Sequence, residues 1–238
     1  MTERELSPEM TGIVVSTMIE AGVLIRHIEK VELFQVQGKD FHCGILKGTP
    51  VTICLCGVGK ANAAHGTTLL VEKFRPEILY NVGVAGAYPA SGLVIGDVVL
   101  GEKEIYGDEG LMLGKGFLTM DALGFPLVRA AGKDYYNEFP LFIPEGLRGY
   151  RAKGAFITLS SCTGSPARGR ELESRFNALC ENMEGAAVAH VCALAGIPVV
   201  EIRGISNLIE DRTPAPLAKG DIIKAAENVQ KFFLERFV

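Results

Sequence analysis

The amino-acid sequence predicts an α/β fold, because apolar, β-branched segments alternate along it with segments of helical periodicity. The clearest helix signal lies in residues 183–194, where apolar side chains recur at helical spacing. Residues 199–205 are mostly apolar and β-branched, which is typical of a buried strand. Asn182 and Gly196 are the residue types expected just before and just after a helix. The chain length suits one domain, which we expect to span residues 1–238.

The other elements follow from the same criteria. Apolar runs predict strands at residues 11–17, 31–46 (as a pair), 51–56, 96–100 and 153–159, with a further strand entered from 76–81. Helical spacing predicts helices at residues 18–29, 167–179 and 217–238, and an alanine-rich helix after the glycines at 57 and 59. Residues 111–149 carry many glycines, prolines and aromatics, which indicates long loops with short elements. Residues 212–217 are expected to form an exposed loop.

Composition excludes several classes of function. The net charge is -4 with no block of like charge, so we expect no nucleic-acid partner. No apolar run approaches the roughly 20 residues of a membrane span. The first ten residues are polar and acidic, unlike a secretory signal, which favours a cytoplasmic protein. The cysteines are scattered, so we expect buried, reduced thiols rather than disulfides or a metal site; they stand at 43, 54, 56, 162, 180 and 192.

The segment G-V-G-K at residues 57–60 forms a tight turn into a helix but is not a nucleotide triphosphate site. It lacks the preceding glycine and the Lys-Ser/Thr ending of a phosphate-binding loop, and it lacks the third glycine of the dinucleotide fingerprint. We therefore expect Lys60 to be a surface residue at the helix start and His65 to be a packed residue. Cys162 has no histidine that can be placed beside it as a base, so a cysteine nucleophile is not expected.

Two motifs carry a family resemblance. N-M-E-G-A-A at residues 182–187 and I-R-G-I-S-N at 202–207 resemble the signature of the nucleoside phosphorylase and nucleosidase superfamily, and the resemblance extends from Ile13 to about Arg212. It implies a three-layer αβα sandwich with a mixed, largely parallel sheet, and no metal or other cofactor. It also implies that Met183 and Glu184 grip the ribose and that Asn207 handles the base.

Within that superfamily the chain most resembles the futalosine hydrolases of menaquinone biosynthesis. Thr17, Glu20 and Ala21 fit their pattern in the first strand–helix loop, which implies that Glu20 activates water. Adenosine-type nucleosidases have Met-Glu-Glu-Glu here, and counting from Met18 would place their water-activating glutamate on Ala21 instead. Glu20 is therefore either the general base or a solvated glutamate that the helix dipole favours in a first turn.

The resemblance places the rest of the pocket at two strand ends. Val84, Ala85 and Gly86 match the glycine-rich strand end where backbone approaches the nucleoside, although thioether nucleosidases usually have Ser where Val84 stands. Thr163 and Gly164 match the base-binding wall of futalosine hydrolases. Phosphorylases have a phosphate-binding arginine just before their glycine run, and this chain has none there, which favours water as the nucleophile.

We therefore predict an enzyme that hydrolyses futalosine to hypoxanthine and dehypoxanthinyl futalosine, with Glu20, Glu184 and Asn207 as its catalytic residues. The alternatives are a methylthioadenosine/adenosylhomocysteine-type nucleosidase and a non-catalytic nucleoside-binding module. The resemblance also implies a homodimer or larger homo-oligomer, with residues 111–149 at the subunit interface. Arg203 is expected to be a structural ion-pair partner of Glu201 or of a neighbouring chain, outside the site.

Overall fold

A mixed ten-stranded sheet forms the centre of the computed structural model, which describes residues 10–114, 116–210 and 219–237. Its strand order is β11-β6-β12-β13-β5-β1-β4-β3-β2, and β14 pairs with both β5 and β6. The bounds of these strands are β1 Thr11–Val15, β2 Glu29–Val36, β3 Lys39–Leu46, β4 Thr49–Leu55, β5 Ile78–Ala87, β6 Val98–Tyr106, β11 Glu138–Pro140, β12 Ala152–Thr158, β13 Ala178–Asn182 and β14 Val199–Leu208.

The strands around the site are parallel. β1 runs parallel to β4 and β5, and β14 runs parallel to β5. Antiparallel pairs surround this parallel centre: β2 with β3, β3 with β4, β13 with β5, β14 with β6 and β11 with β6. The carboxyl ends of β1, β5 and β14 therefore meet at one edge, where an open α/β sheet binds its ligands.

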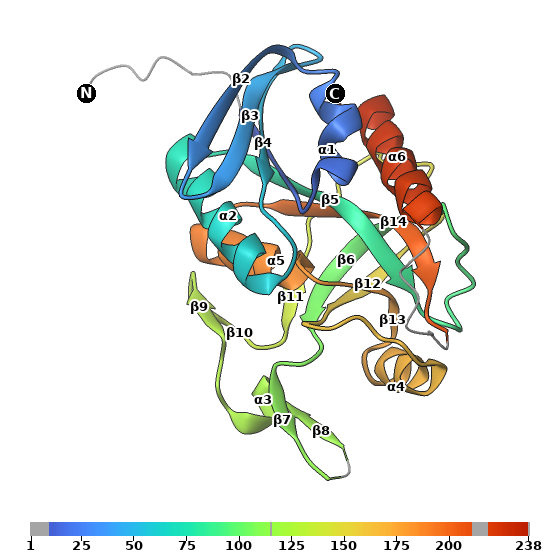
Figure 1. Cartoon of the computed structure of the whole chain (residues 1–238). Coiled ribbons are helices and arrows are strands. Elements are labelled where there is room, and N and C mark those ends of the chain that lie inside the picture. Colours follow the sequence, from blue (N-terminus) through green and yellow to red (C-terminus); the bar gives the residue numbers. More distant parts are fainter. Residues whose placement is uncertain (1–9, 115, 211–218, 238) are drawn as a thin grey trace.

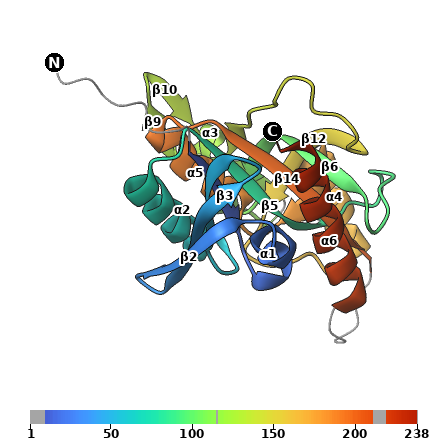
Figure 2. The same ribbon diagram turned by 90° about the horizontal axis from the view of Figure 1, so that it is seen from above.

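Helices cover both faces of the sheet (Figures 1 and 2). On one face lie α1 (Met18–Ile25) and α6 (Lys219–Arg236), whose apolar side chains pack on residues of β1, β4 and β14. On the other face lie α2 (Lys60–Phe74) and α5 (Gly185–Ala195), packed on β1, β4 and β5. α4 (Pro166–Phe176) lies beside β13. This arrangement confirms the predicted three-layer αβα sandwich. Among the described helices, none combines the length and the apolar character that a membrane span requires.

Two predicted boundaries are wrong for a physical reason. The helix expected from Met183 begins at Gly185, because β13 continues to Asn182 and the chain needs residues 183 and 184 to turn from strand into helix. Asn182 still serves this helix, since its Oδ1 accepts from the backbone N–H of Glu184 at 2.9 Å. The first helix ends at Ile25 rather than near residue 29, where β2 already begins.

The described residues between 110 and 135 form short elements, as predicted, and project from the sheet (Figure 1). These elements are β7 Gly110–Met112, β8 Phe117–Thr119, α3 Met120–Leu123, β9 Val128–Ala130 and β10 Lys133–Tyr135. The loop expected at residues 212–217 lies outside the described residues, as do the first two residues and the last of the helix predicted at 217–238.

Candidate active site

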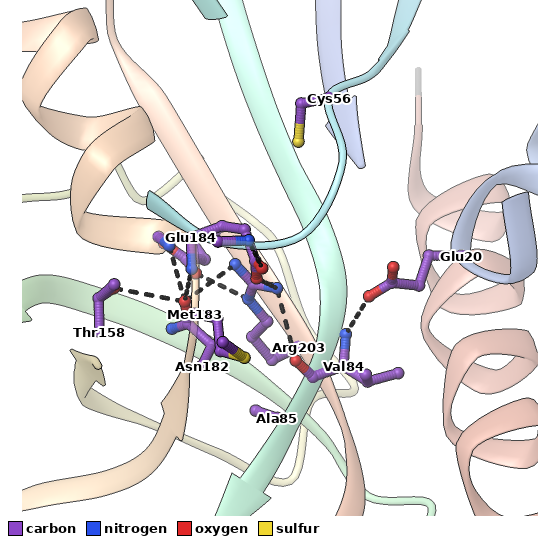
Figure 3. Close-up of polar contacts among 12 residues, drawn as sticks. Glu20, Cys56, Val84, Ala85, Thr158, Asn182, Met183, Glu184 and Arg203 are labelled. Atoms are coloured by element: carbon purple, nitrogen blue, oxygen red, sulfur yellow. Dashed lines mark hydrogen bonds and ion pairs between the residues drawn. The ribbon is translucent and has the colours of Figure 1, made fainter. Parts of the chain in front are cut away.

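Glu20 stands at the carboxyl end of β1, in the first turn of α1, and is buried. Its Oε2 accepts from the backbone N–H of Thr17 at 3.0 Å and from the Thr17 hydroxyl at 2.8 Å. Its Oε1 accepts from the backbone N–H of Val84 at 3.0 Å, across the edge of the sheet (Figure 3). The glutamate is therefore not a solvated residue of the helix surface. Ala21, the alternative position, is fully buried and carries no functional group.

The environment of Glu20 suits a base that titrates above the ordinary range. Burial raises the pKa of this carboxyl above its usual value of 4.5. The charge of Arg203 and the hydrogen bonds from Thr17 and Val84 act in the opposite direction, and the charge of Glu184 adds to the rise. A carboxylate with a raised pKa is a stronger proton acceptor, and one lone pair of Oε1 remains for a further donor such as water.

Glu184 occupies the N-cap position of α5, in the turn that follows β13. Its side chain is buried, and Oε1 accepts from the backbone N–H of Gly59 at 2.8 Å. Gly59 has φ of 93°, a conformation that favours glycine, so this turn presents its N–H to the carboxylate. The other oxygen, Oε2, lies 3.9 Å from Nη1 of Arg203. One carboxylate oxygen is thus anchored, and the second is loosely paired and available to hydroxyl donors.

Arg203 lies inside the site, and its expected place outside the site is wrong. It is 0% exposed on β14, and its Nε donates to Oε1 of Glu201 at 2.7 Å. Its Nη1 lies 3.4 Å from the carbonyl oxygen of Val84. A Cβ at Gly83 would collide with Nη1 of Arg203 and lie 2.8 Å from Oε1 of Glu20. The Arg203 guanidinium and the Glu20 carboxylate therefore both occupy the space that a side chain at position 83 would fill.

The sequence held a signal for this residue. Glu201 and Arg203 are two positions apart in a strand of otherwise apolar residues, so both side chains point to the same face of a buried sheet. Buried charges are paired or functional, because an unpaired charge is costly to desolvate. Of the two partners expected for Arg203, Glu201 or a neighbouring chain, the structure shows Glu201. The sequence did not predict that this pair lies beside Glu20 and Glu184.

The strand end of β5 acts through its backbone. The N–H of Val84 is held by Glu20, and the carbonyl of Ala85 accepts from the Ser206 hydroxyl at 3.2 Å. A Cβ at Gly86 would lie 2.7 Å from Nδ2 of Asn207, so this glycine makes room for the amide. All three residues of this strand end therefore contact or make room for the side chains of Glu20, Ser206 or Asn207.

Asn207 lies at the carboxyl end of β14, where the register with β5 shifts between Ile205 and Asn207. Oγ of Ser206 lies 3.1 Å from Oδ1 of Asn207 and 3.2 Å from the carbonyl oxygen of Ala85, so its single proton serves these two acceptors between them. Nδ2 lies 3.4 Å from the carbonyl oxygen of Leu208, a long contact that leaves its donors little engaged. The amide nitrogen therefore has hydrogen-bonding capacity to offer a substrate.

The loop after β12 contacts β13 and the turn that follows it, through Cys162 and Thr163. Sγ of Cys162 lies 3.6 Å from Sδ of Met183, which brings this loop to the Met-Glu pair. Thr163 is buried, and its hydroxyl donates to Glu181 at 2.6 Å, so the side chain is not free to bind a base. Tyr88 donates to the same carboxylate at 3.0 Å. Gly164 follows as an exposed residue.

Two surface expectations need correction. Lys60 is no simple surface residue, because its Nζ pairs with Asp108 at 2.6 Å and with Glu109 at 2.8 Å. These two ion pairs connect the turn that contains Gly59 with the loop after β6. Cys162 is exposed, although the cysteines were expected to be buried. In the described part of the chain, no group of three or more His, Cys, Asp or Glu side chains is arranged to hold a metal ion.

The fold agrees with comparisons to known proteins. The family described as the phosphorylase superfamily matches residues 11–238, and the chain belongs to it. A 5'-methylthioadenosine/S-adenosylhomocysteine nucleosidase of Shewanella halifaxensis is 30% identical over 91% of this chain and 94% of the relative. The futalosine hydrolase of Thermus thermophilus is 36% identical over 68% of this chain and 71% of the relative. Both are purine nucleosidases, and the chain is an N-ribosyl hydrolase of this kind.

Solved structures support the fold. A methylthioadenosine/adenosylhomocysteine nucleosidase of Streptococcus pneumoniae, bound to a transition-state inhibitor, superposes with a TM-score of 0.79 at 24% identity, covering 94% of this chain and 96% of that one. The corresponding enzyme of Neisseria meningitidis, bound to methylthio-immucillin-A, gives 0.80 at 22% identity, covering 95% and 97%. At these identities the likeness shows a shared fold.

Proposed function

We propose that this enzyme cleaves the N-glycosidic bond of a purine nucleoside with a water molecule activated by Glu20. The observation that carries the proposal is the pair of buried carboxylates, Glu20 and Glu184, that meet beside Arg203 at one sheet edge. Glu20 has a raised pKa and a free lone pair, which suits a general base that takes a proton from water. General-base catalysis of this kind contributes about 10²–10⁴ in rate.

Glu184 would stabilise the sugar as the bond breaks. Cleavage of a glycosidic bond passes through an oxocarbenium-like sugar, which makes the ribose hydroxyls more acidic. The unanchored Oε2 of Glu184 can accept from these hydroxyls, and the bond strengthens as positive charge develops. Because Oε1 is fixed by Gly59, the carboxylate needs little reorganisation. Met183, in the same turn, would pack under the ribose.

Water fits this site better than phosphate as the nucleophile. The site does contain a cation, Arg203, but Glu20, Glu184 and Glu201 all surround it. The carboxylates outnumber the guanidinium, so a phosphate dianion would meet net negative charge in a buried place. Adding inorganic phosphate should therefore not raise the rate, and a ribose-1-phosphate-type product would contradict a hydrolase.

Asn207 favours a 6-oxopurine base. Because Nδ2 makes only a 3.4 Å contact with the Leu208 carbonyl, the amide can direct N–H donors at a substrate. Hypoxanthine offers acceptors at N7 and O6, whereas adenine has a donor amino group at position 6. This supports futalosine as the substrate, with hypoxanthine and dehypoxanthinyl futalosine as products. The enzyme would then act in menaquinone biosynthesis in the cytoplasm.

A methylthioadenosine/adenosylhomocysteine nucleosidase is the second candidate, and the comparisons favour it. Most of the relatives have that name, including one from Maridesulfovibrio salexigens that is 28% identical over 94% of this chain and 96% of its own length. Val84 and Asn207 are the residues that differ from the adenosine-type pattern. A binding module without turnover is the third possibility, and it requires that Glu20 not act as a base.

One assay separates these candidates. The purified enzyme is incubated in parallel with futalosine, methylthioadenosine and adenosylhomocysteine, and free hypoxanthine and adenine are followed by chromatography. We expect hypoxanthine from futalosine at a kcat/KM well above that for either adenine nucleoside. Turnover of methylthioadenosine but not futalosine would move the enzyme to the second candidate. Tight binding of a nucleoside without release of its base would favour the binding module.

We also propose that the chain forms a homodimer or larger homo-oligomer. The projecting segment exposes apolar side chains that a monomer would leave in water, namely Leu111, Met112, Leu113, Leu118 and Phe125. Light scattering of the purified enzyme would give the oligomeric state directly, and a monomeric mass would contradict this proposal.

A further inference from the structure

A second layer of buried carboxyl groups lies behind the site. Glu104 on β6 and Glu201 on β14 are both 0% exposed. A Cβ at Gly185 would collide with the Glu104 carboxyl and lie 2.5 Å from Oε1 of Glu201, so both groups occupy the space beneath the start of α5. Glu104 accepts from the Thr158 hydroxyl at 2.8 Å and from Nδ2 of Asn182 at 2.5 Å. None of these contacts is needed for the proposed chemistry itself.

The two carboxyl groups need a proton between them. The carboxyl oxygens of Glu104 and Glu201 both border the same small space beside Gly185, and two carboxyl groups so placed can hydrogen-bond to each other only if one of them is protonated. Nε of Arg203 donates to Oε1 of Glu201 at 2.7 Å, so this oxygen already has a donor. The remaining oxygen of Glu201, Oε2, is buried and has no N–H or hydroxyl donor among the described residues. A proton on Glu104 supplies the missing donor.

This pair is connected to both carboxylates of the site. Glu201 makes the one short contact of the Arg203 guanidinium, whose other contacts, to Val84, Asn182 and Glu184, are 3.4–3.9 Å long. Glu104 orients Asn182, whose Oδ1 accepts from the N–H of Glu184 and of Gly185. The pair therefore sets the direction of the guanidinium and the shape of the turn that carries Glu184.

We propose that Glu104 and Glu201 share one proton and act together as positioning residues, which hold Arg203 and the Glu184 turn in the geometry that the reaction requires. The predicted effect on catalysis depends on the proposed hydrolase function. The shared proton itself does not depend on that function. At high pH the pair would lose its proton, leaving two adjacent carboxylates. Their repulsion would displace the guanidinium and weaken catalysis.

Several groups face Glu104 from the surrounding strands. Burial is the first cause that raises the pKa of its carboxyl, and the charge of Glu201 and the hydrogen bond to it add to the rise. Arg203 and the Asn182 amide oppose the rise. Burial also raises the pKa values of the Cys180 thiol and the Tyr106 phenol, with the Glu104 charge adding to each rise. Both groups therefore stay neutral beside the pair at neutral pH.

Infrared spectroscopy tests the shared proton without any substrate. The wild-type enzyme at pH 7 should show the carbonyl stretching band of a protonated carboxyl group, and Glu104→Gln should remove it. Glu102→Gln is the matched control, because Glu102 is on the same strand but pairs with Lys153 at the surface. The control should keep the band. Absence of the band from the wild-type enzyme would overturn the proposal, whatever the variants do.

Kinetics tests the positioning role. Glu104→Gln can still donate to Glu201 but cannot lose a proton, so its kcat at pH 7 should stay within about tenfold of wild type. We expect kcat of wild type and of Glu102→Gln to fall on the alkaline side, and this fall should be absent from Glu104→Gln or shifted to higher pH. An alkaline limb unchanged by Glu104→Gln would show that the pair only contributes to stability and would refute the positioning role.

Discussion

At the residue scale, each proposed function depends on which atoms of a side chain are already engaged. Glu20 has three donors on its two oxygens, Glu184 has one backbone donor, and Asn207 makes only a long contact through its Nδ2. The residue types could be predicted from the sequence by family resemblance. Their hydrogen-bond partners could not be predicted, because they are distant in sequence. Gly59 lies 125 positions from Glu184, and Val84 lies 64 positions from Glu20.

Replacing Glu184 by Gln should separate binding from catalysis. The amide keeps the size of the side chain but loses the charge that stabilises the oxocarbenium-like sugar. We expect kcat and kcat/KM to fall together by about 10²–10³-fold, as when a group acting in the transition state is removed. Glu227→Gln, at the surface of α6, is the control and should behave as wild type. A rise in KM alone would mean that Glu184 only binds substrate.

Asn207→Asp should change which base is preferred. An aspartic acid can donate to N7 and accept from a 6-amino group, whereas the amide donates to N7 and O6. We expect the ratio of kcat/KM for futalosine to that for aminodeoxyfutalosine to fall by about tenfold or more, because reversing a polar pair leaves a buried group unsatisfied. Steady-state kinetics with both substrates gives the ratio. If the ratio is the same in both proteins, Asn207 does not recognise the base.

At the element scale, the strand ends and turns bring the site together. The sequence predicted most strands and helices because their apolar periodicity is local, but it missed β13, whose first residues were assigned to the helix predicted at 167–179. It missed the helix start at Gly185 and placed Arg203 outside the site, because both depend on contacts between strands. Glu104 attracted no prediction for the same reason, since its partners lie on β12, β13 and β14.

Two turn glycines, Gly59 before α2 and Gly38 between β2 and β3, offer a pair of substitutions to compare. Gly59 and Gly38 both have positive φ, 93° and 75°, and an added Cβ would meet nothing within 4 Å at either. Each change to alanine should cost about 1–2 kcal/mol of stability through backbone strain. Only Gly59→Ala should also lower kcat, by about 10²-fold, because a shifted N–H would misplace Glu184. Thermal unfolding and kinetics of both variants check this, and equal activity would contradict the role of the Gly59 N–H.

At the scale of the whole molecule, the buried carboxyls tie stability to pH. The folded-state pKa values of Glu20 and Glu104 are raised above 4.5, so the folded chain binds protons that the unfolded chain has lost. The stability that each group contributes is fully present below its unfolded pKa. It is lost as the pH rises through the raised folded value. Burial lowers the folded-state pKa of His190. This group therefore makes the free energy of unfolding fall as the pH drops below about 6.5, the pKa of an unfolded histidine.

Comparing variants isolates the contribution of Glu104. As the pH rises above 4.5, the wild-type free energy of unfolding should fall relative to that of Glu104→Gln. The slope should be at most about 1.4 kcal/mol per pH unit, the value for one proton. Glu102→Gln should follow wild type. Denaturant unfolding across this range measures the difference, and parallel curves for wild type and Glu104→Gln would show that Glu104 ionises normally in the fold.

The most direct test of the central proposal is the rate at which Glu20→Gln releases hypoxanthine from futalosine. If Glu20 activates water, the amide cannot take the proton, and kcat should fall by about 10²–10⁴-fold with little change in KM. Wild-type kcat/KM should fall on the acid side at a pH above 4.5, because burial raises the pKa of this carboxyl. Glu29→Gln, an exposed glutamate at the start of β2, should match wild type. Hypoxanthine release by Glu20→Gln at the wild-type rate would contradict the role of Glu20 as the general base.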